Sequence, residues 1–370
     1  MNTRHSAAII LAAGLSSRSS SFKPLLPLGE ETIVDHVISV FQVNLVDVFL
    51  VVGHRRDEVN AAVRDRDICI IENPDYERGM LTSVQAGARA LDSRYHSFFV
   101  MPVDIPLVRP ATIGRLLNEA EKHPSKIIYP VFNKRRGHPP LIPSDLIPSI
   151  LDWNKEGGLK AALSANSSRE VVVPDGNILF DVDTPDDHRE LLHRFQRIHI
   201  PTDAECEAIL DDICRVSRDI RRHSLTVAEV AVRIAEALNK SAHKVDVDAV
   251  RSAATLHDIA KGNPEHDAAG GRILHNLGFG LIGDIVAVHT DLGDADSEYS
   301  IEAKIVYLAD KCADGTKLVD IESRYQSAGN KYAVTPEIES NIARRRERAL
   351  RVKREIELIL GCTLEKIIFE

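Results

Sequence analysis

Residues 7–26 read AAIILAAGLSSRSSSFKPLL, in which an apolar run passes through Gly14 into a serine-rich loop that carries Arg18 and Lys23. The apolar run predicts a buried strand, because a strand covered on both faces is apolar throughout. A glycine at its end lets the backbone turn sharply and point N–H groups at an anion. Small side chains and the two cations then predict a cradle for a triphosphate at the carboxyl edge of a parallel sheet. A serine-rich surface loop without a ligand is the alternative.

The first half of the chain alternates between short apolar runs and helix-like stretches. The runs are rich in valine, isoleucine and phenylalanine, and they predict strands at 7–11, 46–52, 68–71, 98–103 and 127–131. The stretches between them predict helices at 33–42, 82–91 and 111–122. This alternation is typical of an α/β domain with a largely parallel sheet, which we predict over residues 1–192.

The second half of the chain has a different pattern, in which long helical periodicity replaces the strands. It predicts helices at 204–216, 224–238, 247–256, 267–277, 301–314 and 337–360. Asp203 and Ser224 are suitable residues for helix N-caps. We therefore predict an all-α domain over residues 203–370, joined to the first domain by a linker at 193–202.

Composition limits the classes of function. The chain has 370 residues, enough for two domains, and a formal net charge of −9, which argues against a general nucleic-acid binder. The apolar runs are far shorter than a membrane span, so no membrane association is expected. The five cysteines are scattered and form no CxxC pair, which fits reduced thiols in the cytoplasm.

Two carboxylates follow predicted strands in the first domain. Asp104 lies in MPVDIP after the strand at 98–103, and Asp183 lies in DVDTP after another apolar pair. Carboxylate oxygens are the ligands that Mg²⁺ prefers when it also binds phosphates. Ordinary helix N-caps are the alternative for each residue alone, but together with Lys23 they favour a metal–nucleotide site.

Several motifs in the first domain resemble those of molybdenum-cofactor nucleotidylyltransferases, the MobA/MocA-like NTP transferases. The opening stretch is similar to their LAAGxSxRMGxxKxLL signature, and NPDYERGMLTSVQAG at 73–87 to their GMxxSxxxG segment. MPVDIP resembles the family's PxDxP, RRGHPPLI at 135–142 its GHP element, and DVDTP its closing acidic motif. The resemblance covers about residues 6–192 and implies a Rossmann-like fold of the nucleotide-diphospho-sugar transferase type. LAAG followed by GHP is more similar to the cytidylyl-transferring branch than to the guanylyl branch.

The resemblance implies roles for individual residues. Mg²⁺ would be bound by Asp104 and Asp183, and the triphosphate by Arg18 and Lys23, with Lys23 and Asp104 acting in catalysis. The nucleotide or acceptor would be contacted by Leu11, Ala12, Ala13, Gly14, Gly79, Ser83 and His138. The implied reaction is attack of an acceptor phosphate, such as that of molybdopterin, on the α-phosphorus of an NTP, with CTP favoured. The chain departs from the family at Ser19-Ser20, where the signature has Met-Gly, and this puts the activity in doubt but not the fold.

Histidines and aspartates in the second domain stand at a spacing typical of metal ligands. His257-Asp258 ends one predicted helix, His223 opens another 34 residues earlier, and Asp310 lies in a third, 52 residues after Asp258. Helices at these positions can bring the side chains to one interior point, and an acidic residue in an apolar helix usually needs a partner. Imidazole and carboxylate ligands suit Zn, Mn, Fe or Co better than Ca.

The pattern H…HD…D resembles that of the HD-domain metal-dependent phosphohydrolases. The resemblance implies one or two divalent transition metals bound by His223, His257, Asp258 and Asp310. His266 and His289 match the extra histidines of members that hold two metals, although each could instead be a surface histidine. Lys261 would meet a substrate phosphate, Asp258 would also orient the attacking water, and the substrate would be a phosphoester.

A basic stretch at 341–354 contains seven arginine or lysine residues. Ala349, Val352, Ile356 and Ile359 recur there at helical spacing, which predicts an amphipathic helix that packs on the core with its charges outward. A nucleic-acid or lipid role is the less favoured interpretation.

The sequence thus supports a bifunctional enzyme that joins an NTP transferase to an HD phosphohydrolase. The alternative is a regulatory module in which a degraded transferase senses a nucleotide and controls the hydrolase. An RNA-processing factor is a third possibility, which the negative net charge opposes.

Overall fold

The computed structural model describes residues 5–15, 22–241, 243–293, 299–332 and 335–369. Contacts within it divide the chain into two compact units, Met1–Ile198 and His199–Glu370. Helix α7 (Pro185–Gln196) extends into the stretch predicted as a linker. Only the part of that stretch that lies between α7 and α8 is non-helical. In the described part of the chain, every helix is too short or too polar to cross a bilayer.

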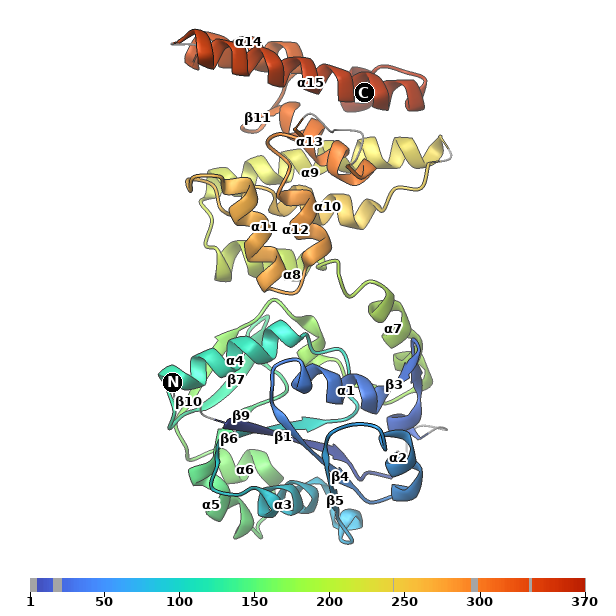
Figure 1. The fold of residues 1–370 in the computed structure, drawn as a ribbon, viewed down its shortest axis with the longest axis vertical. Helices are drawn as coiled ribbons and strands as arrows, with labels where there is room; N and C mark the ends of the chain where they lie inside the picture. Colours follow the sequence, from blue (N-terminus) through green and yellow to red (C-terminus); the bar gives the residue numbers. More distant parts are fainter. Residues whose placement is uncertain (1–4, 16–21, 242, 294–298, 333–334, 370) are drawn as a thin grey trace. The chain divides into compact units, whose positions relative to one another are not determined.

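Unit 1 is built on an eight-stranded sheet in the order β10-β7-β9-β6-β1-β4-β5, with β8 paired to β7 (Figure 1). Its strands are β1 (His5–Ala12), β4 (Asp47–Val52), β5 (Cys69–Glu72), β6 (Tyr95–Pro102), β7 (Ile127–Phe132), β8 (Arg135–Arg136), β9 (Leu141–Pro143) and β10 (Ser168–Val172). Most neighbours are parallel, whereas β9 runs antiparallel to both β6 and β7. The prediction of a largely parallel α/β domain is confirmed, and the antiparallel β9 is an addition to it.

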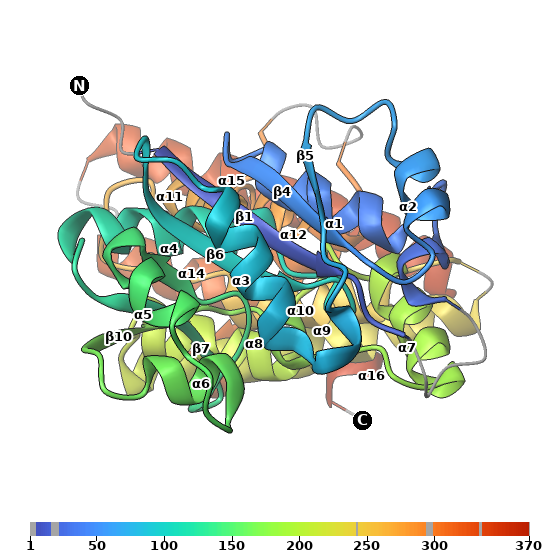
Figure 2. The same cartoon turned by 90° about the horizontal axis from the view of Figure 1, so that it is seen from below.

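Helices cover both faces of this sheet, α1 and α4 on one and α3, α5 and α6 on the other (Figure 1). The helices are α1 (Ile33–Gln42), α2 (Arg56–Ala62), α3 (Met80–Ala90), α4 (Pro110–Lys122), α5 (Ile147–Leu151) and α6 (Gly158–Leu163). Seen from below, α3 lies across the middle of the sheet (Figure 2). A Cβ atom on Gly87 of α3 would lie 2.4 Å from Ile9 Cγ2 of β1, so glycine allows the close approach of this helix.

Unit 2 is helical around one apolar core that includes Ile234, Leu256 and Tyr307, all fully buried. Its helices are α8 (Asp203–Ala208), α9 (Arg218–Lys240), α10 (Val247–Leu256), α11 (His266–Asn276), α12 (Gly280–Val286), α13 (Ile301–Lys311), α14 (Ile321–Tyr332), α15 (Pro336–Leu360) and α16 (Leu364–Phe369). The prediction of a helical second half is confirmed.

Several details of that prediction are wrong. Helix α9 begins at Arg218 with Ser217 as its N-cap, so Ser224 lies inside the helix, and Thr202 rather than Asp203 caps α8. The helix expected to reach residue 216 is α-helical only as far as Ala208, and a short π-helical turn follows it. The helix expected to reach residue 314 ends at Lys311, and a small antiparallel ribbon of β11 (Ala313–Asp314) and β12 (Lys317–Leu318) follows it.

The basic stretch forms the middle of α15, within a helix as predicted. Ala349, Val352 and Ile356 are buried against the core, and most of the charged residues are exposed. Arg348 is the exception, because its side chain is only 4% exposed and pairs with Asp291. Packing of its apolar side on the core therefore accounts for the amphipathic pattern of this helix.

Candidate active sites

A cavity of about 320 Å³ opens at the carboxyl ends of β1 and β6 in unit 1. It is lined by Leu11, Ala12, Ala13, Gly14, Leu15, Lys23, Pro24, Tyr76, Glu77, Gly79, Met80, Ser83, Pro102, Val103 and Asp104. This is the edge at which open α/β sheets bind ligands. A Cβ atom on Gly14 would meet no described atom within 4 Å, so the backbone at Gly14 borders open space in the described part of the chain.

Lys23 lies between two carboxylates beside this cavity. Its Nζ is 2.5 Å from Asp183 Oδ1 and 3.6 Å from Asp104 Oδ2, and its side chain is 10% exposed. Burial raises the pKa of Asp104, while the charge of Lys23 opposes that shift. One buried cation and two partly exposed carboxylates therefore share one point, where charge interactions are stronger than in bulk water.

The backbone fixes the relative positions of these carboxylates. The amide of Val103 donates to Leu11 O at 3.2 Å, and the amide of Val182 donates to Asp104 O at 2.9 Å, which aligns three segments at one edge. Neither aspartate is a helix N-cap: α4 has Arg109 in that position, and α7 has Thr184. The N-cap alternative for Asp104 and Asp183 is thereby excluded.

The wall of the cavity opposite β1 comes from the start of α3. Gly79 precedes the helix with a φ of 112°, a backbone conformation that favours glycine. Ser83 is buried, and its Oγ accepts a hydrogen bond from Asn73 Nδ2 at 2.9 Å. Sequence reasoning missed Asn73 as well as the lining residues Tyr76 and Met80, because nothing in their type alone indicates binding.

Among the described residues, two of those predicted for this site, His138 and Asp183, are not in this lining. His138 is partly buried, its burial lowers its pKa, and its Nδ1 has no hydrogen-bond partner among the described residues. Arg18 and the Ser19-Ser20 departure lie outside the described residues. The lining contains the other described residues expected at the nucleotide. Asp183 is not part of the lining but contacts Lys23, which is.

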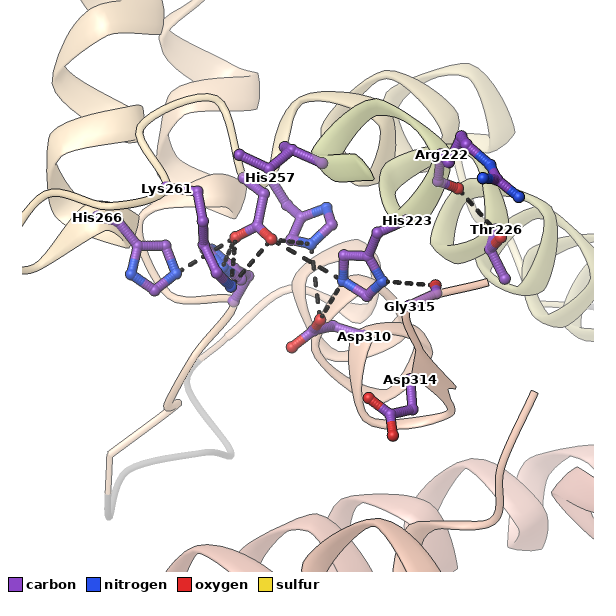
Figure 3. Close-up of polar contacts among 12 residues, drawn as sticks. Arg222, His223, Thr226, His257, Lys261, His266, Asp310, Asp314 and Gly315 are labelled. Carbon is purple, nitrogen blue, oxygen red and sulfur yellow. Dashed lines mark hydrogen bonds and ion pairs between the residues drawn. The ribbon is translucent and has the colours of Figure 1, made fainter. Parts of the chain in front are cut away.

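A second cluster lies inside unit 2, where the six predicted metal-ligand residues converge. They come from α9 (His223), the end of α10 (His257, Asp258), the start of α11 (His266), the segment after α12 (His289) and α13 (Asp310). Figure 3 shows His223, His257, His266 and Asp310 around one centre, with Lys261 beside it. The convergence is as the spacing in the sequence predicts.

Asp258 is shared between two groups of ligands. Its Oδ2 lies 3.5 Å from His257 Nε2 and 3.9 Å from His223 Nε2. Its Oδ1 lies 3.3 Å from His266 Nε2 and 3.5 Å from His289 Nε2. Ligand atoms within each group lie within 4.8 Å of one another, so each group has the dimensions of a metal site. One carboxylate thus faces two potential metal positions.

The histidine rings are oriented for metal binding. Nδ1 of His257 and of His289 each lies 2.7 Å from a backbone carbonyl, and Nδ1 of His223 lies 3.0 Å from another. A carbonyl only accepts, so each Nδ1 carries the hydrogen and Nε2 is the atom left for a ligand. Nε2 of His257 and of His266 is buried with no hydrogen-bond partner among the described residues, an arrangement that a metal ion would satisfy.

The electrostatics of the cluster favour ionised carboxylates. Burial opposes ionisation of Asp310, but the charge of Lys311 and the neighbouring rings of His223 and His257 outweigh it and hold its pKa well below the usual value. The pKa of Asp258 is also lowered, because His289, His257 and Lys261 outweigh its burial. Lys261 Nζ lies 3.0 Å from Asp258 Oδ2 on the solvent side of the cluster. Ionised carboxylates and Nε2 lone pairs are the donor set of divalent transition metals.

Comparison with known proteins finds a known domain family in each unit. The model of the MobA-like NTP transferase domain matches residues 8–171, and that of the HD domain matches residues 220–314. The molybdenum cofactor cytidylyltransferase of Escherichia coli is 31% identical over 191 residues, which are 51% of this chain and 97% of that protein. A probable molybdenum cofactor guanylyltransferase of Mycobacterium avium is 29% identical over 193 residues, 50% of this chain and 94% of that protein. The crystal structure of Rv0371c from Mycobacterium tuberculosis matches with 26% identity and a TM-score of 0.47, covering 52% of this chain and 100% of that one.

Proposed function

Because the chain belongs to the MobA-like NTP transferase family through residues 8–171 and contains an HD domain at 220–314, we propose that it is a bifunctional enzyme. Unit 1 would transfer a nucleotidyl group from an NTP to a phosphorylated acceptor such as molybdopterin. Unit 2 would hydrolyse a phosphoester. Two separate clusters of charged residues, one in each unit, support two activities.

The first reaction is a substitution at phosphorus. An oxygen of the acceptor phosphate bonds to the α-phosphorus of the NTP as the bond to the bridging oxygen breaks, and pyrophosphate leaves. Lys23 would hold the triphosphate by its charge, which is the main contribution a protein makes to such a step. Asp104 and Asp183 offer the oxygen ligands of Mg²⁺, which when bound neutralises charge on the phosphates.

We propose CTP as the preferred nucleotide. The end of β1 and the two residues after it read LAAG, which puts Ala13 next to Gly14 in the cavity lining. The E. coli relative is a cytidylyltransferase by name, whereas the mycobacterial relative is a probable guanylyltransferase. A comparison of CTP with GTP under the same conditions tests this preference.

For the second reaction, the observation that carries the proposal is Asp258 facing two ligand groups. His223, His257, Asp258 and Asp310 would hold one divalent metal, and Asp258, His266 and His289 a second. Such metals lower the pKa of bound water and polarise a phosphate oxygen. Lys261 would bind the substrate phosphate at the exposed side of the cluster, because about half of its side chain is open to solvent.

The experiment measures both reactions on one preparation. Purified protein is incubated with CTP or GTP, Mg²⁺ and a molybdopterin-type acceptor, and pyrophosphate release is followed. Phosphoester hydrolysis is followed separately with added Mn²⁺ or Co²⁺. We expect both reactions to occur. If no acceptor yields pyrophosphate and Asp104→Ala still changes the hydrolysis rate, unit 1 is a nucleotide sensor for unit 2 instead.

A further inference from the structure

The histidines around Asp258 obtain their orientation from two different sources. His257 donates through Nδ1 to Ala254 O, and His289 donates to Val286 O, in each case a carbonyl three residues earlier in the same segment. His223 instead donates to Gly315 O, 92 residues later in the chain. The orientation of His223 therefore depends on a distant segment, while local helical structure orients the other two.

That distant segment contacts both nitrogens of the His223 ring. Nε2 lies 3.2 Å from Asp310 Oδ1, and Nδ1 lies 3.0 Å from Gly315 O, so the ring is held between two points five residues apart (Figure 3). Asp310 belongs to α13, and Gly315 lies in the turn of the β11–β12 ribbon that follows. Since the carbonyl fixes the hydrogen on Nδ1, Nε2 is directed at the ligand position.

The position of the Gly315 carbonyl depends on the ribbon. Asp314 pairs with Lys317 across it, and Gly315 has a φ of 61°, in the left-handed region. The turn is exposed, and Arg324 of α14 holds it through an ion pair of 2.6 Å to Asp314. A change confined to this exposed turn can therefore move the carbonyl without disturbing the core.

We infer that the β11–β12 ribbon is a positioning element for His223 and that it sets the affinity of one metal position selectively. That position is the one formed by His223, His257, Asp258 and Asp310, whereas the position formed by Asp258, His266 and His289 does not depend on the ribbon. The inference rests on the proposed metal-dependent hydrolase function.

A matched pair of substitutions at Gly315 isolates the effect. A Cβ atom there would meet nothing within 4 Å, so asparagine and valine both enter open space. They differ in backbone preference: asparagine tolerates a left-handed conformation, and a β-branched residue does not. Gly315→Val should shift the carbonyl, and Gly315→Asn should leave it in place. Arg324→Gln, which keeps the glycine and loosens the ribbon, is a milder variant for the case that Gly315→Val folds poorly.

Two measurements on the full chain test the inference. In a Co²⁺ titration followed by absorption, wild type and Gly315→Asn should bind two equivalents, and Gly315→Val should bind one of them about 10–100-fold more weakly, the usual cost of losing such a partner. Equal affinities in Gly315→Val and Gly315→Asn, or equal weakening of both equivalents, would overturn it.

In metal-free protein labelled with ¹⁵N-histidine, His223 should be protonated at Nδ1 in wild type, with an altered signal in Gly315→Val. An unprotonated Nδ1 in wild type overturns the positioning role alone, whereas absence of Co²⁺ binding to wild type refutes the proposed metal site and this inference with it.

Discussion

The Nζ atom of Lys23 lies 2.5 Å from Oδ1 of Asp183, although 160 residues separate them in the sequence. Asp104 Oδ2 lies 3.6 Å from the same ammonium group. Removing the cation would leave two carboxylates facing each other beside the cavity. The charge on Lys23 therefore holds the two carboxylates together, and the proposed function requires the same charge to receive a triphosphate.

Lys23→Met should lower kcat/KM for pyrophosphate release by about 100-fold or more, a cost typical of losing one preorganised charge contact in a transition state. Lys122→Met is the matched control, because this lysine is 68% exposed at the end of α4 and does not line the cavity. Steady-state kinetics with varied CTP measure the effect. A Lys23→Met enzyme with unchanged kcat/KM would show that the ammonium group plays no part in the reaction.

Removal of metal should destabilise unit 2 and leave unit 1 unaffected. A metal at about 100 times its dissociation constant stabilises the folded state by about 2.7 kcal/mol, which for a unit of this size is a shift in melting temperature of roughly 5–10 °C. Calorimetry with and without a chelator measures the two transitions. The same chelator should have little effect on Asp258→Asn, and a full shift in that variant would place the stabilising metal elsewhere.

Asp258 should be needed by both metal positions, because its two oxygens face different histidine pairs. We expect Asp258→Asn to lose both equivalents of Co²⁺ and His266→Gln to lose only one. Elemental analysis after gel filtration measures the stoichiometry. Retention of one equivalent by Asp258→Asn would show that the carboxylate does not serve both positions.

A buried ion pair stabilises the core of unit 1. Arg109 Nη1 lies 2.7 Å from Asp175 Oδ1, both side chains are at most 5% exposed, and the hydroxyl of Thr112 donates to the same carboxylate. Asp175→Ala leaves a buried guanidinium without this partner and should cost about 3–5 kcal/mol of the free energy of unfolding. Asp65→Ala, which removes an exposed ion pair with Arg64, should cost under about 1 kcal/mol. Urea denaturation compares them, and equal costs would contradict the importance of burial.

The close packing of α3 on β1 should leave no room for a side chain at position 87. The nearest atom to a new Cβ is Ile9 Cγ2, which is itself fully buried, so Gly87→Ala should destabilise unit 1 by about 1–3 kcal/mol through overpacking. Gly114→Ala is the control within α4, since its nearest neighbour is the flexible tip of Asn44 at 3.3 Å. Melting temperatures of the two variants give the comparison, and a Gly87→Ala protein as stable as wild type would refute the packing argument.

The sequence was most informative where residue types carried unusual chemistry. Histidine and aspartate in apolar helices are costly unless paired, so His257, Asp258 and Asp310 are candidates for one cluster from the sequence alone, and the structure brings the three side chains together. The place of His138 outside the cavity lining could not be read from the sequence, because it follows a loop and the path of a loop depends on tertiary contacts. The β11–β12 ribbon was missed because strands of two residues have no periodicity to detect.

Burial of charge was the other limit on prediction. Helical periodicity in α15 predicts Ala349 and Val352 inside but gives no reason for Arg348 to join them. The structure supplies the reason in Asp291, which lies in a segment 57 residues earlier and pairs with Arg348. Pairings of this kind depend on the fold as a whole.

The presence of two independent active sites in one chain is tested most directly by a cross-comparison of two variants. Pyrophosphate release and phosphoester hydrolysis are measured side by side on wild type, Asp104→Asn and Asp258→Asn. We predict that Asp104→Asn loses pyrophosphate release and keeps hydrolysis, and that Asp258→Asn shows the reverse. Loss of both reactions in either variant, or a wild-type protein that carries out only one of them, would contradict the account.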